Sequence, residues 1–245
     1  MIALMLRGQA IAAPKTQLGS VEVIRHLKIA RDTAVKSRSV SMVTLKTLII
    51  NAPAELRDGI DQIKGKIALI RYIAAFRPGP ITSTTASAKA AMRSLARRWL
   101  MLNDEIAELD KELKALVEAK APSLMASHGI ATLTIAEMLI LVGDNPGRIR
   151  SEAALAKLCG VCPIPASSGK THRFRLNRGG NRQANAALYR VVIVRMRNHE
   201  PTLAYVRKRT KDGKSKSEII RCLKRYIVRE IFTHLCRSET LKNSC

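Results

Sequence analysis

The chain has 245 residues, enough to bury one large core or two small ones. Its 43 Lys and Arg outnumber 19 Asp and Glu and give a net charge of +24, so the expected partner is a polyanion, nucleic acid before membrane. Aromatic residues make up 3% of the sequence, too few for a protein that binds single strands by stacking bases on aromatic rings. This charge also argues against an enzyme for a neutral metabolite.

The sequence gives no sign of membrane insertion or secretion. No apolar run approaches the roughly 20 residues that a membrane helix needs, and Arg7 interrupts an N-terminal stretch that lacks the order of a signal peptide. The five cysteines are an odd number in a long chain, so we expect reduced thiols and a cytoplasmic protein. Residues 151–245 carry +15 of the net charge, which predicts that this part binds the anion.

Helical spacing dominates the first half of the chain. A helix is predicted from about residue 21 to 51, with Arg31 and Arg38 on its surface and Pro53 as its stop. A second helical stretch, 54–76, ends at a Pro-Gly-Pro sequence. Apolar residues of the first helix recur every seven positions, at Val35, Met42 and Ile49.

The clearest periodic signal comes next. Eight apolar residues lie alternately three and four positions apart, which is the spacing of a coiled-coil seam: Met92, Leu95, Trp99, Leu102, Ile106, Leu109, Leu113 and Leu116. A seam specifies a partner helix but not the chain from which it comes. Two alternatives are therefore open: an antiparallel hairpin with the helix at 21–51 of the same chain, and an arm that joins two copies into a homo-oligomer.

Shorter helices are predicted after Pro122, and a basic hairpin among them. Prolines, glycines and serines fill residues 162–180, where a short alternating piece at 172–176 indicates a strand. The helices are expected at about 125–142, from the N-cap Ser151 to Leu158, at 181–198, from Pro201 to Thr210, and from the Ser215 and Glu218 capping box to Leu235.

The hairpin region contains a candidate nucleophile. Ser167 and Ser168 are adjacent hydroxyls before a glycine, and a Lys, Arg and Asn cluster follows them. A serine that attacks a phosphodiester needs cations near the negative charge that develops on phosphorus. The alternative is a flexible Ser-Gly turn before a hairpin that contacts DNA. In either case, the expected nucleic-acid contacts are Lys170, Arg173, Arg175, Asn177, Arg178 and Arg182.

Two further features of the C-terminal part suggest anion binding. Gly180 and Asn181 stand where a helix begins, and a glycine there lets backbone N–H groups approach a phosphate. In the last helix, Arg221, Arg225 and Arg229 recur four residues apart. Such a face either lies along a nucleic-acid backbone or is simply solvated, and the charge of this part of the chain favours contact through Arg221 and Arg225.

The cysteines offer only an incomplete metal site. Cys159 and Cys162 have the spacing of half a zinc site, but no second pair with metal-ligand spacing occurs in the sequence. Buried thiols are the simpler interpretation, and no metal ligand is assigned.

Three motifs of the C-terminal part resemble a known family. They are GDNPGRIRSEAALAKLCG at 143–160, PIPASSGKT at 163–171 and RLNRGGNRQANAAL at 175–188. They resemble the C-terminal domain of bacterial insertion-sequence transposases with a RuvC-like N-terminal domain, the DEDD recombinases related to pilin-gene invertases and guided by a bridge RNA. The resemblance extends more loosely over residues 20–120 as the coiled-coil region of that family.

The resemblance implies an active site in two parts. In that family an Asp, Glu, Asp, Asp set in the RuvC-like domain holds a divalent metal, and a C-terminal serine attacks DNA and becomes joined to it. The motif places this serine at Ser168, with Ser167 as the runner-up. No acidic residue precedes Glu22, so we expect a truncated transposase that binds nucleic acid but needs Mg²⁺-binding carboxylates from elsewhere for strand exchange.

The sequence therefore predicts a mostly α protein with a long-helix coiled-coil region followed by a compact helical DNA-binding domain. Its expected parts are 1–19, a remnant or linker; 20–122, the coiled-coil region; 123–237, the transposase domain; and 238–245, a tail. The expected partners are DNA, a guide RNA and a second copy of the chain. The alternative function is a non-catalytic nucleic-acid-binding protein, or a dominant-negative partner that dimerises with an intact transposase.

Overall fold

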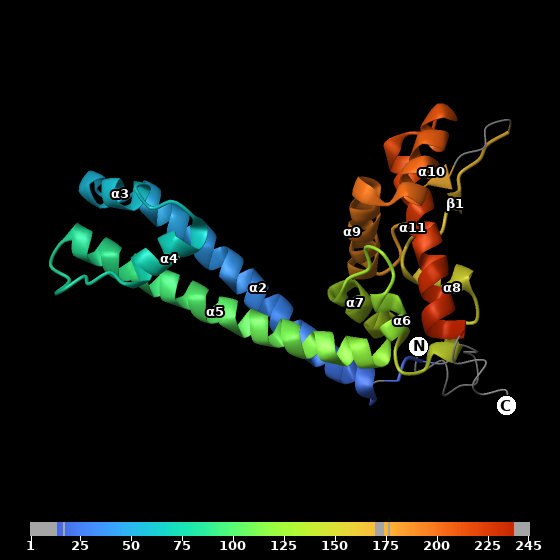
Figure 1. Ribbon diagram of the computed structural model, residues 1–245, viewed down its shortest axis with the longest axis horizontal. Helices are drawn as coiled ribbons and strands as arrows, with labels where there is room; N and C mark the ends of the chain where they lie inside the picture. The colour runs from blue at the N-terminus through green and yellow to red at the C-terminus, as the bar shows by residue number, and fades with distance from the viewer. Residues whose placement is uncertain (1–13, 17, 170–173, 176, 238–245) are drawn as a thin grey trace. The chain divides into compact units, whose positions relative to one another are not determined.

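The computed structural model describes residues 14–16, 18–169, 174–175 and 177–237. The regular elements of the described chain are helices and one pair of two-residue strands, which confirms the mostly α prediction (Figure 1). It divides into two compact units, residues 26–112 and the remainder. No helix of the described residues is both long and apolar enough to cross a membrane.

Two long helices form most of the first unit, α2 (Ser20–Ile50) and α5 (Thr84–Lys120). Between them lie α3 (Ala54–Asp61) and α4 (Lys66–Ala74). The prediction of one helix over 54–76 was wrong, because the helix is interrupted before Gly65. This glycine has a φ of 94°, a conformation outside the α-helical region that glycine adopts without steric cost.

The predicted seam of α5 packs against α2 of the same chain. Leu102 and Ile106 cluster with Ala34, and Met92 and Trp99 cluster with Leu45. Residue numbers rise along α2 as they fall along α5, so the two helices are antiparallel. The intramolecular hairpin is thus the alternative that the structure shows, and a homo-oligomer through this seam stays a prediction.

Polar residues occupy the middle of this hairpin. Arg31 Nε donates to Asp110 Oδ1 at 2.9 Å, and Arg38 Nη1 donates to Asn103 Oδ1 at 2.8 Å. The prediction that both arginines lie on the outer surface was wrong, because they stand seven residues apart in the row of α2 that faces α5, between Ile24 and Leu45. Paired polar residues in a helical seam fix the register of the two helices.

The second unit contains the motifs of the resemblance. Its core is formed by α7 (Thr132–Val142), α9 (Arg182–Asn198) and α11 (Lys216–Phe232), with α8 (Glu152–Leu158) and α10 (Glu200–Lys211) packed beside α11 and α9. Shorter elements are α6 (Pro122–Met125), the 3₁₀ turn η1 (Pro146–Arg148) and the π turn η2 (Thr233–Arg237). The buried side chains of the three core helices include Ile135, Met138, Leu188, Val192, Ile219 and Ile227.

The helix starts follow the capping residues predicted from the sequence. Ser151 accepts a hydrogen bond from Ala154 N at 3.2 Å and caps α8. Ser215 and Glu218 form the predicted capping box of α11. Each cap satisfies N–H groups that lack a partner within the helix.

Candidate nucleic-acid interface

The basic hairpin is present, and the candidate nucleophile lies on its loop. Strands β1 (Ile164–Pro165) and β2 (Phe174–Arg175) are antiparallel, with Ile164 opposite Arg175 and Pro165 opposite Phe174. Ser167 and Ser168 follow β1 with exposed side chains, and Gly169 turns the chain with a φ of 54°. The structure thus leaves residue Ser168 exposed to solvent.

The structure describes three of the five basic residues that were predicted to contact nucleic acid in this region. Arg175, Arg178 and Arg182 are exposed, and no carboxylate of the described chain pairs with them. Asn177 is half-buried, and its Oδ1 accepts a hydrogen bond from Gly179 N at 2.9 Å, so it stabilises the turn. Lys170 and Arg173 lie outside the described residues.

Gly180 has a packing role that the sequence prediction missed. A Cβ atom at this position would lie 2.1 Å from Gly160 N and 2.3 Å from Gly160 Cα. The side of Gly180 on which a Cβ would stand is therefore filled by the backbone of Gly160. Glycine at 180 brings the two ends of the hairpin into backbone contact.

Asn181 also has a structural role. Its side-chain Oδ1 accepts a hydrogen bond from Ala184 N at 2.9 Å, and its backbone N–H donates to Leu158 O at 2.7 Å. The Asn181 side chain thus caps the start of α9, and its backbone N–H is used within the protein.

Asn185 and Lys224, which the sequence analysis did not single out, reinforce this junction. Asn185 Nδ2 donates to Cys159 O at 2.9 Å and to Gly160 O at 3.1 Å, while its Oδ1 accepts from Lys224 Nζ at 2.7 Å. Burial lowers the pKa of Lys224, and its ammonium lies 5.2 Å from the centre of the Tyr189 ring. The sequence feature that could have indicated this role is that Asn185 is a polar residue between Ala184 and Leu188, which are both buried.

Two of the three arginines spaced four residues apart along α11 form salt bridges with a single carboxylate, that of Glu152. Arg225 Nη2 lies 2.6 Å from Glu152 Oε1, and Arg229 Nε lies 2.7 Å from Glu152 Oε2. The hydrogen bond from Arg229, with the charges of both arginines, lowers the pKa of Glu152. Arg225 was predicted to contact nucleic acid, but the structure uses it to join α11 to α8. Arg221 remains exposed.

A second ion pair holds the inner side of α9. Arg195 Nη1 and Nη2 lie 2.8 and 3.0 Å from the two carboxylate oxygens of Glu230, and Arg195 Nε donates to His128 O at 2.8 Å. Burial opposes ionisation of Glu230, yet the hydrogen bonds and charge of Arg195, the hydrogen bond from Ser127 and the charge of His234 together outweigh it and lower the pKa of this carboxyl. Burial, then the charge of Arg195, lowers the pKa of His199, whose ring stacks on His128 at 5.0 Å.

The structure gives no support for a metal centre in the described part of the chain. No three His, Cys, Asp or Glu side chains come together there in a group that could hold an ion. Burial raises the pKa of Cys159 to about 12, so its thiol is protonated at neutral pH.

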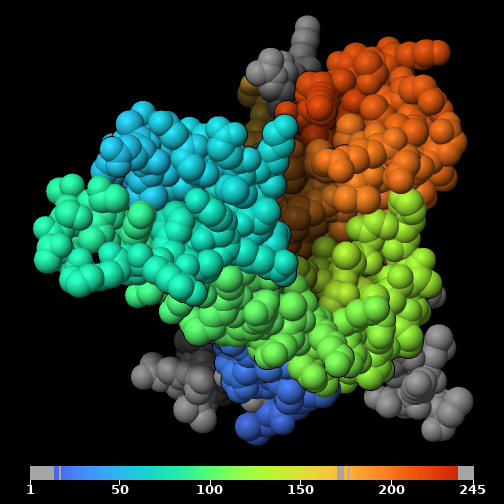
Figure 2. Space-filling model, turned by 60° about the vertical axis from the view of Figure 1, so that its left-hand side comes forward, coloured from blue at the N-terminus to red at the C-terminus, as the bar shows by residue number. Residues whose placement is uncertain are grey.

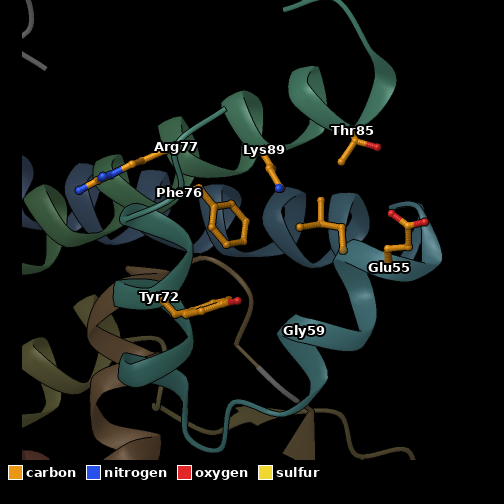
Figure 3. A pocket seen from close by; sticks show the side chains of 8 residues that line it. Glu55, Gly59, Tyr72, Phe76, Arg77, Thr85 and Lys89 are labelled. Atoms are coloured by element: carbon orange, nitrogen blue, oxygen red, sulfur yellow. The ribbon is translucent and has the colours of Figure 1, made fainter. Parts of the chain in front are cut away.

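A pocket of about 250 Å³ lies in the first unit, residues 26–112. None of the residues that line it is a predicted site residue. Figure 3 shows the rings of Tyr72 and Phe76 beside it, while the Arg77 side chain points away. Its lining residues are Glu55, Leu56, Gly59, Tyr72, Phe76, Arg77, Thr85 and Lys89. None of them comes from the hairpin or from α9.

Comparison with known proteins connects the second unit to mobile elements. Residues 121–207 match the sequence profile of the transposase IS116/IS110/IS902 family. The chain is also 27% identical over 154 residues to the insertion element IS110 uncharacterized 43.6 kDa protein of Streptomyces coelicolor. That alignment covers 62% of this chain and 38% of the relative's length. These matches confirm the resemblance to insertion-sequence transposases, and residues 121–207 are the part of the chain that is similar to the IS116/IS110/IS902 family.

Proposed function

We propose that this chain is part of an insertion-sequence transposase that recombines DNA through Ser168. The observation that carries the proposal is that the matched stretch, 121–207, contains the hairpin with its exposed serine. The fastened ends of the hairpin support it, because a nucleophile acts efficiently only when its surroundings hold it in place.

The proposed reaction is the exchange of one phosphate ester for another. Ser168 Oγ forms a bond to the phosphorus of DNA, the bond from phosphorus to a deoxyribose oxygen breaks, and the serine proton passes to the released deoxyribose oxygen, which becomes a hydroxyl. Negative charge builds on the phosphoryl oxygens during this step and is stabilised by nearby cations. Arg175, Arg178 and Arg182 are the described residues that we propose for this, with Lys170 and Arg173 beside them in the sequence.

The described residues supply the nucleophile and cations but no metal site. Their His, Cys, Asp and Glu side chains do not gather into a group that could hold an ion. By the family resemblance, Mg²⁺ and the carboxylates that hold it belong to a RuvC-like domain. We therefore propose that strand exchange requires that domain in addition to the described residues, and that a guide RNA and a second copy of the chain complete the assembly.

Nucleic-acid binding is tested first. The purified chain should bind a DNA duplex, and the logarithm of its affinity should fall steeply with the logarithm of salt concentration, because bound arginines release counterions from the phosphates. A flat salt dependence would remove nucleic acid as the partner.

The serine is then tested with a labelled DNA duplex, Mg²⁺ and a RuvC-like domain added in trans. The expected product is a protein–DNA adduct that survives denaturing electrophoresis. Ser168→Ala should abolish the adduct and leave DNA affinity unchanged, while the neighbouring Ser167→Ala keeps both. If wild type and both variants bind DNA but none forms an adduct, the chain acts as a non-catalytic nucleic-acid-binding protein.

A further inference from the structure

Helix α9 has an outer face whose cations are not used inside the protein. The helix contains 17 residues with four arginines and no acidic residue. Its inner side buries Ala184, Ala187, Leu188, Val191 and Val192. Exposed residues on the opposite side are Arg182, Gln183, Ala186, Tyr189, Arg190, Val194 and Arg197. Figure 2 shows the orange surface of this region and of α10 open to solvent.

The fourth arginine of the helix provides an internal comparison. Arg195 lies toward the core and is held by both oxygens of Glu230. No carboxylate of the described chain forms a salt bridge with Arg182, Arg190 or Arg197. The fold thus pairs the inner arginine and leaves the three outer ones available for an external anion.

The corner between α10 and α11 is also basic, but its charges are partly neutralised. Arg209 pairs with Asp212 at 3.2 Å, and Arg207 forms an ion pair with Glu200. Helix α9 lacks such acids along its full length, so its outer face has the stronger charge complementarity to a polyanion.

We infer that the outer face of α9, defined by Gln183, Ala186, Arg190 and Arg197, binds the major groove of a DNA duplex. This inference rests on the proposed function and names the surface and the form of its partner. The four residues recur at intervals of three, four and seven along the helix, so they form one stripe. The stripe extends about 21 Å at 1.5 Å per residue, a length suited to the groove of B-form DNA.

The side chains of the stripe suit this groove. Exposed Ala186 allows the helix backbone to approach the base edges, and an alanine can contact a thymine methyl. Gln183 lies in the first turn, where a recognition helix commonly contacts bases, and Arg190 and Arg197 can reach guanine edges or phosphates. An A-form RNA duplex has a major groove too narrow for a helix, so we expect a preference for DNA.

The test compares binding of the full chain to a DNA duplex and to an RNA duplex of the same sequence, over a range of salt concentrations. Arg190→Ala with Arg197→Ala should weaken DNA binding about tenfold and reduce the salt slope by about two. The matched control is Arg71→Ala, an exposed arginine of α4, which should leave both values unchanged.

A second pair of variants adds a charge instead of removing one. Ala186→Glu should weaken DNA binding at least as much, whereas Ala107→Glu, at an exposed alanine of α5, should not. All five sites are exposed, so the melting temperature should stay constant.

The outcomes separate the surface from the proposed function. If the chain binds DNA and the α9 variants behave like their controls, the inference about α9 is wrong and the proposed function stands. Equal binding of RNA and DNA, with equal loss in the variants, would overturn the assignment to the DNA major groove. If the wild-type chain binds no duplex, the proposed function fails together with this inference.

Discussion

The contact between Gly180 and Gly160 leads to a sharp prediction about stability. A Cβ atom added by Gly180→Ala would lie 2.1 Å from Gly160 N and 2.8 Å from Cys159 C. Carbon atoms pack at about 3.5–4.0 Å, so the two backbones must separate by more than an ångström. Their separation also strains the Asn181 N to Leu158 O hydrogen bond, now 2.7 Å long.

Overpacking of this kind costs about 1–3 kcal/mol, and we expect the upper end because both partners are backbone. A loss of about 3 kcal/mol lowers the melting temperature of a unit this size by about 6–12 °C. Circular dichroism during thermal and urea unfolding measures both quantities. Gly179→Ala is the matched control, because its Cβ would meet only Asn177 Oδ1, at 3.4 Å.

The same pair of variants separates two reasons for a glycine at position 180. If Gly180 serves packing, Gly180→Ala lowers the free energy of unfolding in the absence of any ligand. If it serves the close approach of a phosphate, Gly180→Ala is as stable as Gly179→Ala and loses only nucleic-acid affinity. The second result would refute the packing argument.

Three further predictions concern the other contacts of the fold. Asn185→Ala removes the partner of two backbone carbonyls and of Lys224 and should destabilise the chain by about 1–3 kcal/mol in urea unfolding; Asn51→Ala, at an exposed asparagine after α2, is its control. Because the folded pKa of Glu230 lies below its unfolded value, its ionisation stabilises the fold above the unfolded pKa, and this contribution is lost as pH falls through the folded pKa. Glu230→Gln should therefore lower the melting temperature relative to wild type at pH 7, and this deficit should shrink as the pH falls through the folded pKa; a deficit that does not change with pH would contradict this assignment. Ile106→Ala, which opens a cavity between α5 and α2, should cost about 2–5 kcal/mol, with exposed Met101→Ala as a control that costs little.

Elements defined by local chemistry were predictable from the sequence. The seam of α5 was visible because its apolar residues repeat with coiled-coil spacing, and Ser151 and Ser215 marked helix starts through hydrogen bonds within one turn. The partner of the seam was not predictable, since spacing constrains only one of the two helices. Its identity follows from contacts such as Ala34 with Ile106 that join distant parts of the chain.

Roles that depend on long-range contacts could not be predicted from a local pattern. The packing contact of Gly180 was not visible because its partner, Gly160, is distant in the sequence. Arg31 and Arg38 were predicted to lie on the surface because charged side chains are usually exposed, yet each forms a hydrogen bond with a polar residue of α5. Sequence patterns report the preference of a residue, whereas these three positions are decided by what packs opposite them.

The same distinction explains why counting arginines overestimates a nucleic-acid surface. In the second unit, carboxylates select which cations remain available, since Glu152 holds Arg225 and Arg229 while Glu230 holds Arg195. Each of these arginines is needed to join two helices, so its charge is neutralised within the fold. The hairpin and the outer face of α9 lack carboxylates of their own, as the segment from 163 to 199 contains no Asp or Glu. The positive charge that remains for a polyanion is therefore concentrated beside Ser168 in the sequence, where a phosphodiester must be held if this serine is the nucleophile.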